Sequence, residues 1–105
     1  MLDAAHDVAR GRPVLVGELG YSTLPEAGAA GETAQAEYYA AAAKLLARAG
    51  LPPFAPWILS DFVAGTVPGR GGTQPREYHF GLRRLDGTEK PAADVVRQMF
   101  SAAAR

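Results

Sequence analysis

The chain has 105 residues, which is enough for one small domain and too few for two. Lysine plus arginine equals aspartate plus glutamate at 11 each, so the formal net charge is zero and charge gives no reason to expect nucleic acid or an anionic membrane as a partner. Cysteine is absent, and the two histidines, His6 and His79, lie far apart, so disulfides, thiolate metal sites and a histidine metal-ligand spacing are excluded.

Membrane insertion and secretion require recognisable apolar segments, and the sequence contains neither kind. No apolar run approaches the roughly 18 residues that a membrane span needs. The N-terminal stretch MLDAAHDVARG is amphipathic and contains acids, unlike the charged n-region and long apolar h-region of a signal peptide. These residues therefore leave the localisation unknown, and a secreted parent protein is compatible with them.

The first expected elements are a helix end and a short buried strand. Residues 1–11 carry a short apolar stripe and end on a glycine, which predicts the tail of a helix. Pro13 ends any helical option. The apolar run Val14–Val16, bounded by Pro and Gly, then predicts a strand over 13–18 that is covered on both faces, as in parallel sheets. This strand would end on the carboxylate of Glu18.

One long helix, a second strand and a last helix follow. Residues 32–49 are rich in alanine, the best helix former, and their apolar side chains repeat at helical spacing. Gly50 and two prolines stop this helix. The aromatic and β-branched stretch 54–62 predicts a strand, and an Asp-Gly turn with Pro91 in a helix start predicts a final helix over 90–104.

Strands that alternate with helices of this length predict parallel βαβ units, so the expected fold class is α/β. Only two strands are expected, and a two-stranded parallel sheet leaves two unpaired edges and cannot cover its apolar faces. We therefore expect the chain to be a piece of a larger α/β protein, either a truncated reading frame in which Met1 is an internal methionine or a dissected fragment. Alone, such a piece is expected to be poorly soluble.

Three stretches stand in an order that resembles a known family: VLVGELG before a helix, then PWILSDF, then YHFGLRRLDGTEKPAADVV. The order is similar to the end of a clan A glycoside hydrolase, and most of all to cellulase-like members of glycoside hydrolase family 5. The resemblance covers residues 12–100. It implies the C-terminal portion of a (β/α)8 TIM barrel, about strands 7 and 8 with flanking helices: 13–18 as strand 7, 32–49 as helix 7, 54–62 as strand 8 and 90–104 as helix 8.

The resemblance also implies roles for four side chains. Glu18 falls on the catalytic nucleophile at the end of the seventh strand, and Trp57 falls on the sugar-stacking position of the eighth. Tyr21 and Asp61 fall beside the cleft as substrate-binding residues. Each of three residues also has a plainer interpretation: Glu18 as a solvated strand-end carboxylate, Trp57 as a core aromatic, and Asp61 as a structural hydrogen-bond acceptor for the loop 65–72.

The implied chemistry accounts for a strand that ends on an isolated glutamate. Active sites of these barrels lie at the carboxyl ends of the strands, and a strand end holds a nucleophile more rigidly than a mobile loop. Gly17 and Gly20 would let the sugar approach without a Cβ clash, and a Trp face suits the apolar face of a pyranose ring. The substrate would be a β-glycoside or oligosaccharide, and the reaction needs no metal or organic cofactor.

A retaining mechanism needs two carboxylates about 5–5.5 Å apart, and we expect this chain to carry one of them. In the family, the acid/base Glu follows an Asn at the end of the fourth strand, and no Asn occurs in the sequence. The expected protein is thus a fragment that carries the nucleophile, lacks the acid/base and has the missing N-terminal barrel strands as its partner. The isolated chain should not hydrolyse glycosides.

Two other functions stay open. One is a non-catalytic carbohydrate-binding or interaction module that uses Trp57 and Tyr21 as a sugar platform, which requires a self-contained fold. The other is a small α/β protein completed by oligomerisation, which predicts a discrete oligomer in solution. The sugar and its linkage depend on the loops of strands that lie outside this chain, so the sequence does not predict them.

Overall fold

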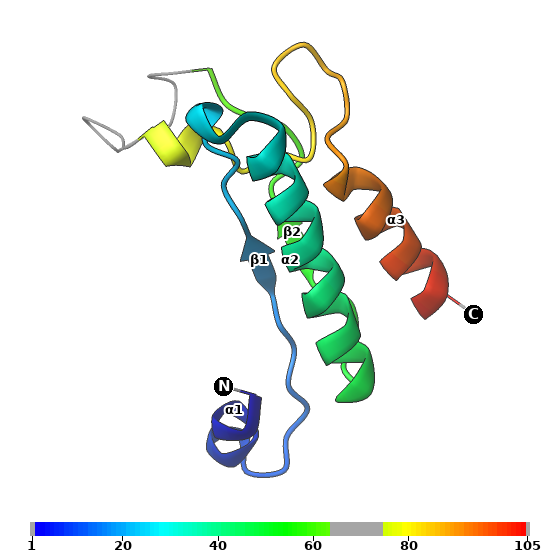
Figure 1. The fold of residues 1–105 in the computed structure, drawn as a ribbon. Coiled ribbons are helices and arrows are strands. Elements are labelled where there is room, and N and C mark those ends of the chain that lie inside the picture. The colour runs from blue at the N-terminus through cyan, green and yellow to red at the C-terminus, as the bar shows by residue number, and fades with distance from the viewer. Residues whose placement is uncertain (1, 64–74, 105) are drawn as a thin grey trace.

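The structure is a computed structural model that describes residues 2–63 and 75–104 (Figure 1). Helices and strands alternate along the chain. In order, the elements are α1 (Leu2–Ala9), β1 (Glu18–Gly20), the 3-10 turn η1 (Pro25–Ala27), α2 (Gly28–Arg48), β2 (Ala55–Trp57), the 3-10 turn η2 (Pro75–Tyr78) and α3 (Ala92–Ala103).

The two strands pair in parallel and form a two-stranded sheet. Glu18 lies opposite Ala55, and Gly20 lies opposite Trp57. The carboxyl ends of paired parallel strands lie at the same edge of their sheet. The segments that follow β1 and β2 therefore start side by side, at one end of the molecule.

Both strands are three residues long, whereas the apolar runs predict strands over 13–18 and 54–62. The expectation that the first strand ends on Glu18 is wrong, because β1 begins at this residue and ends at Gly20. An apolar run marks a segment that can be covered, but a ladder forms only where a partner strand lies alongside, and here the two segments align over a short stretch. After β2 the chain bonds to a later segment instead. Ile58 N donates to Phe80 O at 3.2 Å, and Leu82 N donates to Ile58 O at 2.9 Å.

The helix α2 is the longest element, with 21 residues, and begins at Gly28 rather than at residue 32. Its run of alanines has high helix propensity and no bulky side chain to oppose the earlier start. Gly50 follows the helix with a positive φ of 69°, a conformation that favours glycine. Across this turn, Leu51 N donates to Leu46 O at 2.9 Å.

The helices α2 and α3 pack side by side (Figure 1). Between them and the start of β2 lies the core, where Tyr39 and Phe54 are fully buried with stacked rings whose centroids are 5.4 Å apart. This aromatic pair joins α2 to the strand layer. The buried apolar cluster consists of Tyr39, Leu46, Phe54, Leu82, Ala92, Ala93 and Val96.

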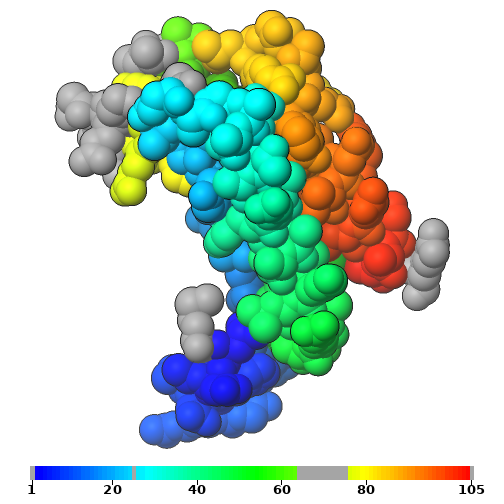
Figure 2. Space-filling model, in the orientation of Figure 1, coloured from blue at the N-terminus to red at the C-terminus, as the bar shows by residue number. Residues whose placement is uncertain are grey.

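The molecule is elongated rather than spherical. Its radius of gyration is 15.2 Å, against about 13 Å for a compact domain of this length. Figure 2 shows the blue segment that contains α1 at one end of the molecule. None of the α1 residues is buried, although Leu2 packs against the core cluster. Large apolar side chains of the strand segments also stay exposed, Leu15 at 67%, Trp57 at 42% and Leu59 at 59%. The residues that the structure describes thus leave part of the strand layer uncovered.

Candidate functional site

Glu18 and Trp57 lie on the same face of the sheet. Glu18 pairs with Ala55 and Gly20 pairs with Trp57, and side chains two residues apart on paired strands point to one side. Leu19, which points the other way, packs against the core. Glu18 and Trp57 are both exposed. The carboxylate and the indole therefore project from the face that α2 does not cover.

These two side chains border one hollow of about 380 Å³. Gly20 lies at its base, because a Cβ there would be 2.9 Å from the Phe80 ring and 3.0 Å from Trp57 O. A Cβ on Gly17, by contrast, would meet nothing within 4 Å. The Phe80 ring is therefore the group that comes close to β1, and it does so at Gly20. The hollow is lined by Glu18, Leu19, Gly20, Trp57, Glu77 and Phe80.

A glutamine on α2 holds the backbone behind this hollow. Gln35 is fully buried, and its Nε2 donates to Tyr21 O at 3.0 Å and to Gly81 O at 3.1 Å. The same nitrogen lies 3.4 Å from Phe80 O. Gln35 Oε1 has no hydrogen-bond partner among the described residues. The amide thus acts as a donor that fixes the carbonyls of the segment after β1 and of the segment that bears Phe80.

Tyr39, one helical turn further along α2, makes the equivalent contact with the strands. Its hydroxyl lies 3.3 Å from Trp57 O and 3.4 Å from Leu19 O. Burial raises the pKa of Tyr39 from its ordinary 10.0 to about 12, because the phenolate would form away from water. The hydroxyl therefore stays protonated and bridges the carboxyl ends of β1 and β2.

Asp61 does not line the hollow and instead belongs to a buried ion pair. Its Oδ1 accepts hydrogen bonds from Lys90 Nζ and from Gly81 N, both at 2.8 Å. The Lys90 and Asp61 side chains are 1% and 8% exposed. Lys90 Nζ also donates to Thr23 Oγ1 at 2.8 Å. The pair joins the segments that follow both strands to the start of α3. The loop 65–72, the hydrogen-bond partner expected for Asp61, lies outside the described residues.

Tyr21 does not line the hollow either. Its ring packs on Tyr38 of α2, with centroids 5.2 Å apart, and its carbonyl accepts the Gln35 bond. Of the four side chains that the resemblance implies, the structure brings Glu18 and Trp57 together and places Tyr21 and Asp61 elsewhere. The last two help to hold the segments that follow the strands.

Two lining residues, Glu77 and Phe80, are not among the predicted site residues. Phe80 belongs to the aromatic-Gly-Leu stretch of the resemblance, so a signal for it is present in the sequence. Glu77 follows a segment rich in Gly and Pro, and no periodicity or motif singles it out. The sequence gives a weaker indication that Gln35 and Lys90 have a structural role. Gln35 is a polar side chain on the apolar face of a helix, and Lys90 directly precedes a helix-starting proline.

A second ion pair braces the turn that precedes α3. Arg84 bonds to Glu32 of α2 at both ends of its guanidinium fork, Nε to Oε1 at 2.8 Å and Nη2 to Oε2 at 2.6 Å. The hydrogen bond to Glu32 raises the pKa of Arg84. Hydrogen bonds from Thr88 lower the pKa of Asp86 in the same turn. The Asp-Gly turn is thus a fixed support rather than part of the hollow.

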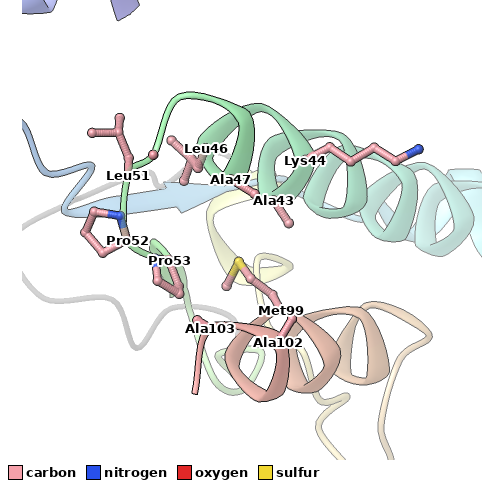
Figure 3. Close-up of a pocket in the computed structure, with 11 residues that line it drawn as sticks. Ala43, Lys44, Leu46, Ala47, Leu51, Pro52, Pro53, Met99, Ala102 and Ala103 are labelled. Carbon is pink, nitrogen blue, oxygen red and sulfur yellow. The ribbon is translucent and has the colours of Figure 1, made fainter. Parts of the chain in front are cut away.

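A different hollow, of about 670 Å³, opens between the C-terminal halves of α2 and α3 (Figure 3). Met99 extends from α3 toward α2, and Pro52 and Pro53 line one side. Lys44 is the only titratable side chain among the described lining residues. Because acid–base chemistry needs positioned titratable groups, this apolar hollow does not compete with the Glu18 hollow as a catalytic centre.

No match emerges when the chain is compared with protein-family models, with curated proteins and with solved structures. Within residues 2–63 and 75–104, no group of three or more His, Cys, Asp or Glu side chains could hold a metal ion. Over the same ranges, no helix is long and apolar enough to cross a membrane. The chemical character of the site therefore rests on its geometry: a carboxylate from the first residue of β1 and an indole from the last residue of β2, on one face of the sheet.

Proposed function

We propose that the chain is the C-terminal portion of the (β/α)8 barrel of a retaining glycoside hydrolase that acts on β-linked glycosides or polysaccharides, with Glu18 as its nucleophile. One observation carries the proposal. Glu18 and Trp57 share a face of two neighbouring parallel strands that are joined by a helix; Glu18 is the first residue of β1, and Trp57, two positions further along the paired strands, is the last residue of β2. Enzymes with (β/α)8 barrels carry their catalytic residues at the carboxyl ends of the strands, and the hollow beside Glu18 reaches that end through Gly20 and Trp57.

The unfinished strand layer supports the same proposal. A two-stranded parallel sheet has no neighbours on its outer edges, and open edges of this kind are normally paired or covered. The exposed Leu15 and Leu59 come from the strand segments. In a closed barrel, neighbouring strands and the filled interior would cover such side chains. The missing N-terminal strands are accordingly the partner that this proposal requires.

In the proposed reaction, Glu18 attacks the anomeric carbon, and a covalent glycosyl–carboxylate bond forms as the glycosidic C–O bond breaks. A second carboxyl group, protonated at the start, gives its proton to the leaving oxygen; as a carboxylate it then takes the proton of the water that releases the sugar. Trp57 binds the apolar face of the ring. The second carboxylate is assigned to the missing strands, so the isolated chain binds sugar without turnover.

An activated fluoro-deoxyglycoside with a dinitrophenolate leaving group tests the nucleophile in the chain itself. Dinitrophenolate leaves without protonation, so the first step needs Glu18 and no acid/base. The chain, held soluble by fusion to a tryptophan-free carrier, should gain the mass of one glycosyl group. Peptide mapping should place that group on Glu18. The Glu18→Gln variant should gain none, and Glu37→Gln, on the exposed face of α2, should label as the parent does.

Labelling at another carboxylate, or equal labelling of Glu18→Gln, would remove Glu18 from the nucleophile role. In the longer protein, Glu18→Gln should abolish turnover and leave the fold intact, because the change is nearly isosteric. Turnover within a few-fold of the parent enzyme would contradict the proposal in that setting.

A non-catalytic carbohydrate-binding module is the second candidate function. It is favoured by the Trp57 indole, which is 42% exposed and lines the hollow together with Phe80. It predicts sugar binding by a stable monomer and no covalent label. Size-exclusion chromatography with light scattering tests whether the chain is a monomer. A discrete, cooperatively unfolding oligomer supports the protein completed by oligomerisation, and an aggregated or molten chain supports a severed barrel end.

A further inference from the structure

We infer that Glu77 is a further substrate-contacting residue, which accepts hydrogen bonds from the sugar stacked on Trp57 and disfavours sugars that carry a carboxylate. The inference rests on the proposed carbohydrate site and names the charge class of its substrate. It starts from the composition of the hollow, in which Glu77 of η2 lines the same 380 Å³ as Glu18 and Trp57.

Glu77 is placed for a ligand rather than for the fold. Its side chain is 27% exposed, and its one ion-pair contact, from Arg76 Nε, is long at 3.8 Å and comes from a side chain that is 62% exposed. Exposed pairs of this kind contribute little to stability. The carboxylate therefore keeps acceptor capacity on the side of the hollow. Asp61, by comparison, is held at 2.8 Å by both Lys90 and Gly81.

The chemistry of the lining selects the partner. A carboxylate only accepts hydrogen bonds, so the ligand has to present hydroxyl or ammonium donors toward Glu77. The aromatic walls, Trp57 and Phe80, suit the apolar face of a sugar ring. No Lys, Arg or His lines this hollow among the described residues. A uronate would thus bring a third carboxylate beside two others, offset only by the exposed Arg76 that lies outside the lining.

Fluorescence of the single tryptophan measures this preference directly, since Trp57 lines the hollow and is 42% exposed. The probes are oligosaccharides of one length and linkage built from glucosamine, glucose or glucuronate. On the carrier-fused chain, glucosamine oligomers should bind most tightly and glucuronate oligomers at least about tenfold more weakly than glucose oligomers, a factor that corresponds to about 1.4 kcal/mol.

Glu77→Gln should reduce the difference in affinity between glucose and glucuronate oligomers to about threefold, because it removes one charge and keeps the side-chain size. High salt should reduce this difference as well, since the screening length falls to about 3 Å at 1 M. The matched control Glu37→Gln removes an exposed charge outside the hollow and should leave the difference unchanged. Arg76→Gln should increase the difference in affinity, because it removes the positive charge that lies 3.8 Å from the Glu77 carboxylate.

The outcomes separate this inference from the proposed function. Equal binding of glucose and glucuronate oligomers, or a difference in affinity that Glu77→Gln and salt leave intact, overturns the role of Glu77 and leaves the carbohydrate site standing. Absence of any fluorescence change with all three oligomers, on a chain shown by circular dichroism to be folded, overturns the carbohydrate site and the role of Glu77 together.

Discussion

The two ends of the α2–α3 pair are held by different kinds of contact. Where the strands end, buried polar groups join separate backbone segments, through Lys90 with Asp61 and through Gln35 with three carbonyls. At the opposite end the contacts are apolar and border a hollow beside Leu46 and Met99. Apolar burial is non-directional, whereas hydrogen bonds require defined distances and angles. Hydrogen bonds therefore fix the relative positions of the segments at the site end, whereas the opposite end stabilises the fold through apolar burial.

The largest expected effect comes from removing the buried cation at the site end. Lys90→Met should lower the free energy of unfolding by about 3–5 kcal/mol, because the Asp61 carboxylate would stay buried without its ammonium partner. Urea unfolding measures the loss as a shift of the midpoint. The double change Lys90→Met with Asp61→Leu removes both charges and should recover part of the loss. A single-variant loss below about 1 kcal/mol would contradict the buried pair.

A methyl group on Gly81 should be the next most damaging change. Its Cβ would lie 2.2 Å from Asp61 N and 2.7 Å from Arg83 O. These contacts are backbone atoms that cannot rotate away, so Gly81→Ala should cost about 3 kcal/mol. Gly17→Ala is the matched control, because a Cβ there meets nothing within 4 Å, and it should unfold as the parent chain does. Equal unfolding midpoints for the two variants would refute the close crossing at Gly81.

At the opposite end, Leu46→Ala should lower stability and leave the site unchanged. Leu46 is 4% exposed, and its loss should cost about 2 kcal/mol, at the low end for a buried leucine because it borders a hollow. The Trp57 emission spectrum should stay as in the parent chain. A shifted Trp57 spectrum in the folded variant would mean that the two ends are coupled and that the comparison fails.

The smallest effect is expected at the bridge between the strands. Tyr39→Phe should cost about 1 kcal/mol at neutral pH, since the hydroxyl contacts Trp57 O and Leu19 O at long distances. The parent chain should also lose stability as the pH rises from 10 toward 12. Over that range the unfolded chain releases the Tyr39 proton near its ordinary pKa of 10.0, while the folded chain holds it up to about 12.

Urea unfolding at several alkaline pH values measures this slope. The excess loss in the parent chain over Tyr39→Phe should be on the order of 1 kcal/mol per pH unit. Parallel slopes for the two proteins would show that Tyr39 titrates in the folded chain as it does in the unfolded one.

The fold was predictable from the sequence where the signal is local. Helical spacing and the Gly50 stop placed the long helix to within four residues at its start, because alanine propensity and a left-handed glycine act within a few residues. The ends of the strands were not predictable. Apolar runs over 13–18 and 54–62 say that a segment can be covered, and they carry no information on where its partner lies.

The candidate site divides in the same way. Glu18 ends the expected strand 13–18 and Trp57 lies within the expected strand 54–62, so the parallel arrangement of two helix-linked strands was enough to place them on neighbouring strands. The pairing register that puts them on one face came from the structure. Glu77 enters the hollow from η2, and its place depends on how residues 75–83 pack against the backbone after β2. No local pattern encodes that packing.

By itself, the sequence determined the alternation of helices and strands, the neutral charge, and a carboxylate and an indole on neighbouring strand segments. Only the tertiary structure decided that Asp61 pairs with Lys90, 29 residues away, and that Lys90 also reaches Thr23, 67 residues away. The physical reason is the distance along the chain over which each kind of interaction acts. Helix propensity, capping and apolar periodicity act over one or two turns, whereas buried ion pairs and hydrogen bonds join atoms that meet only after the chain has packed.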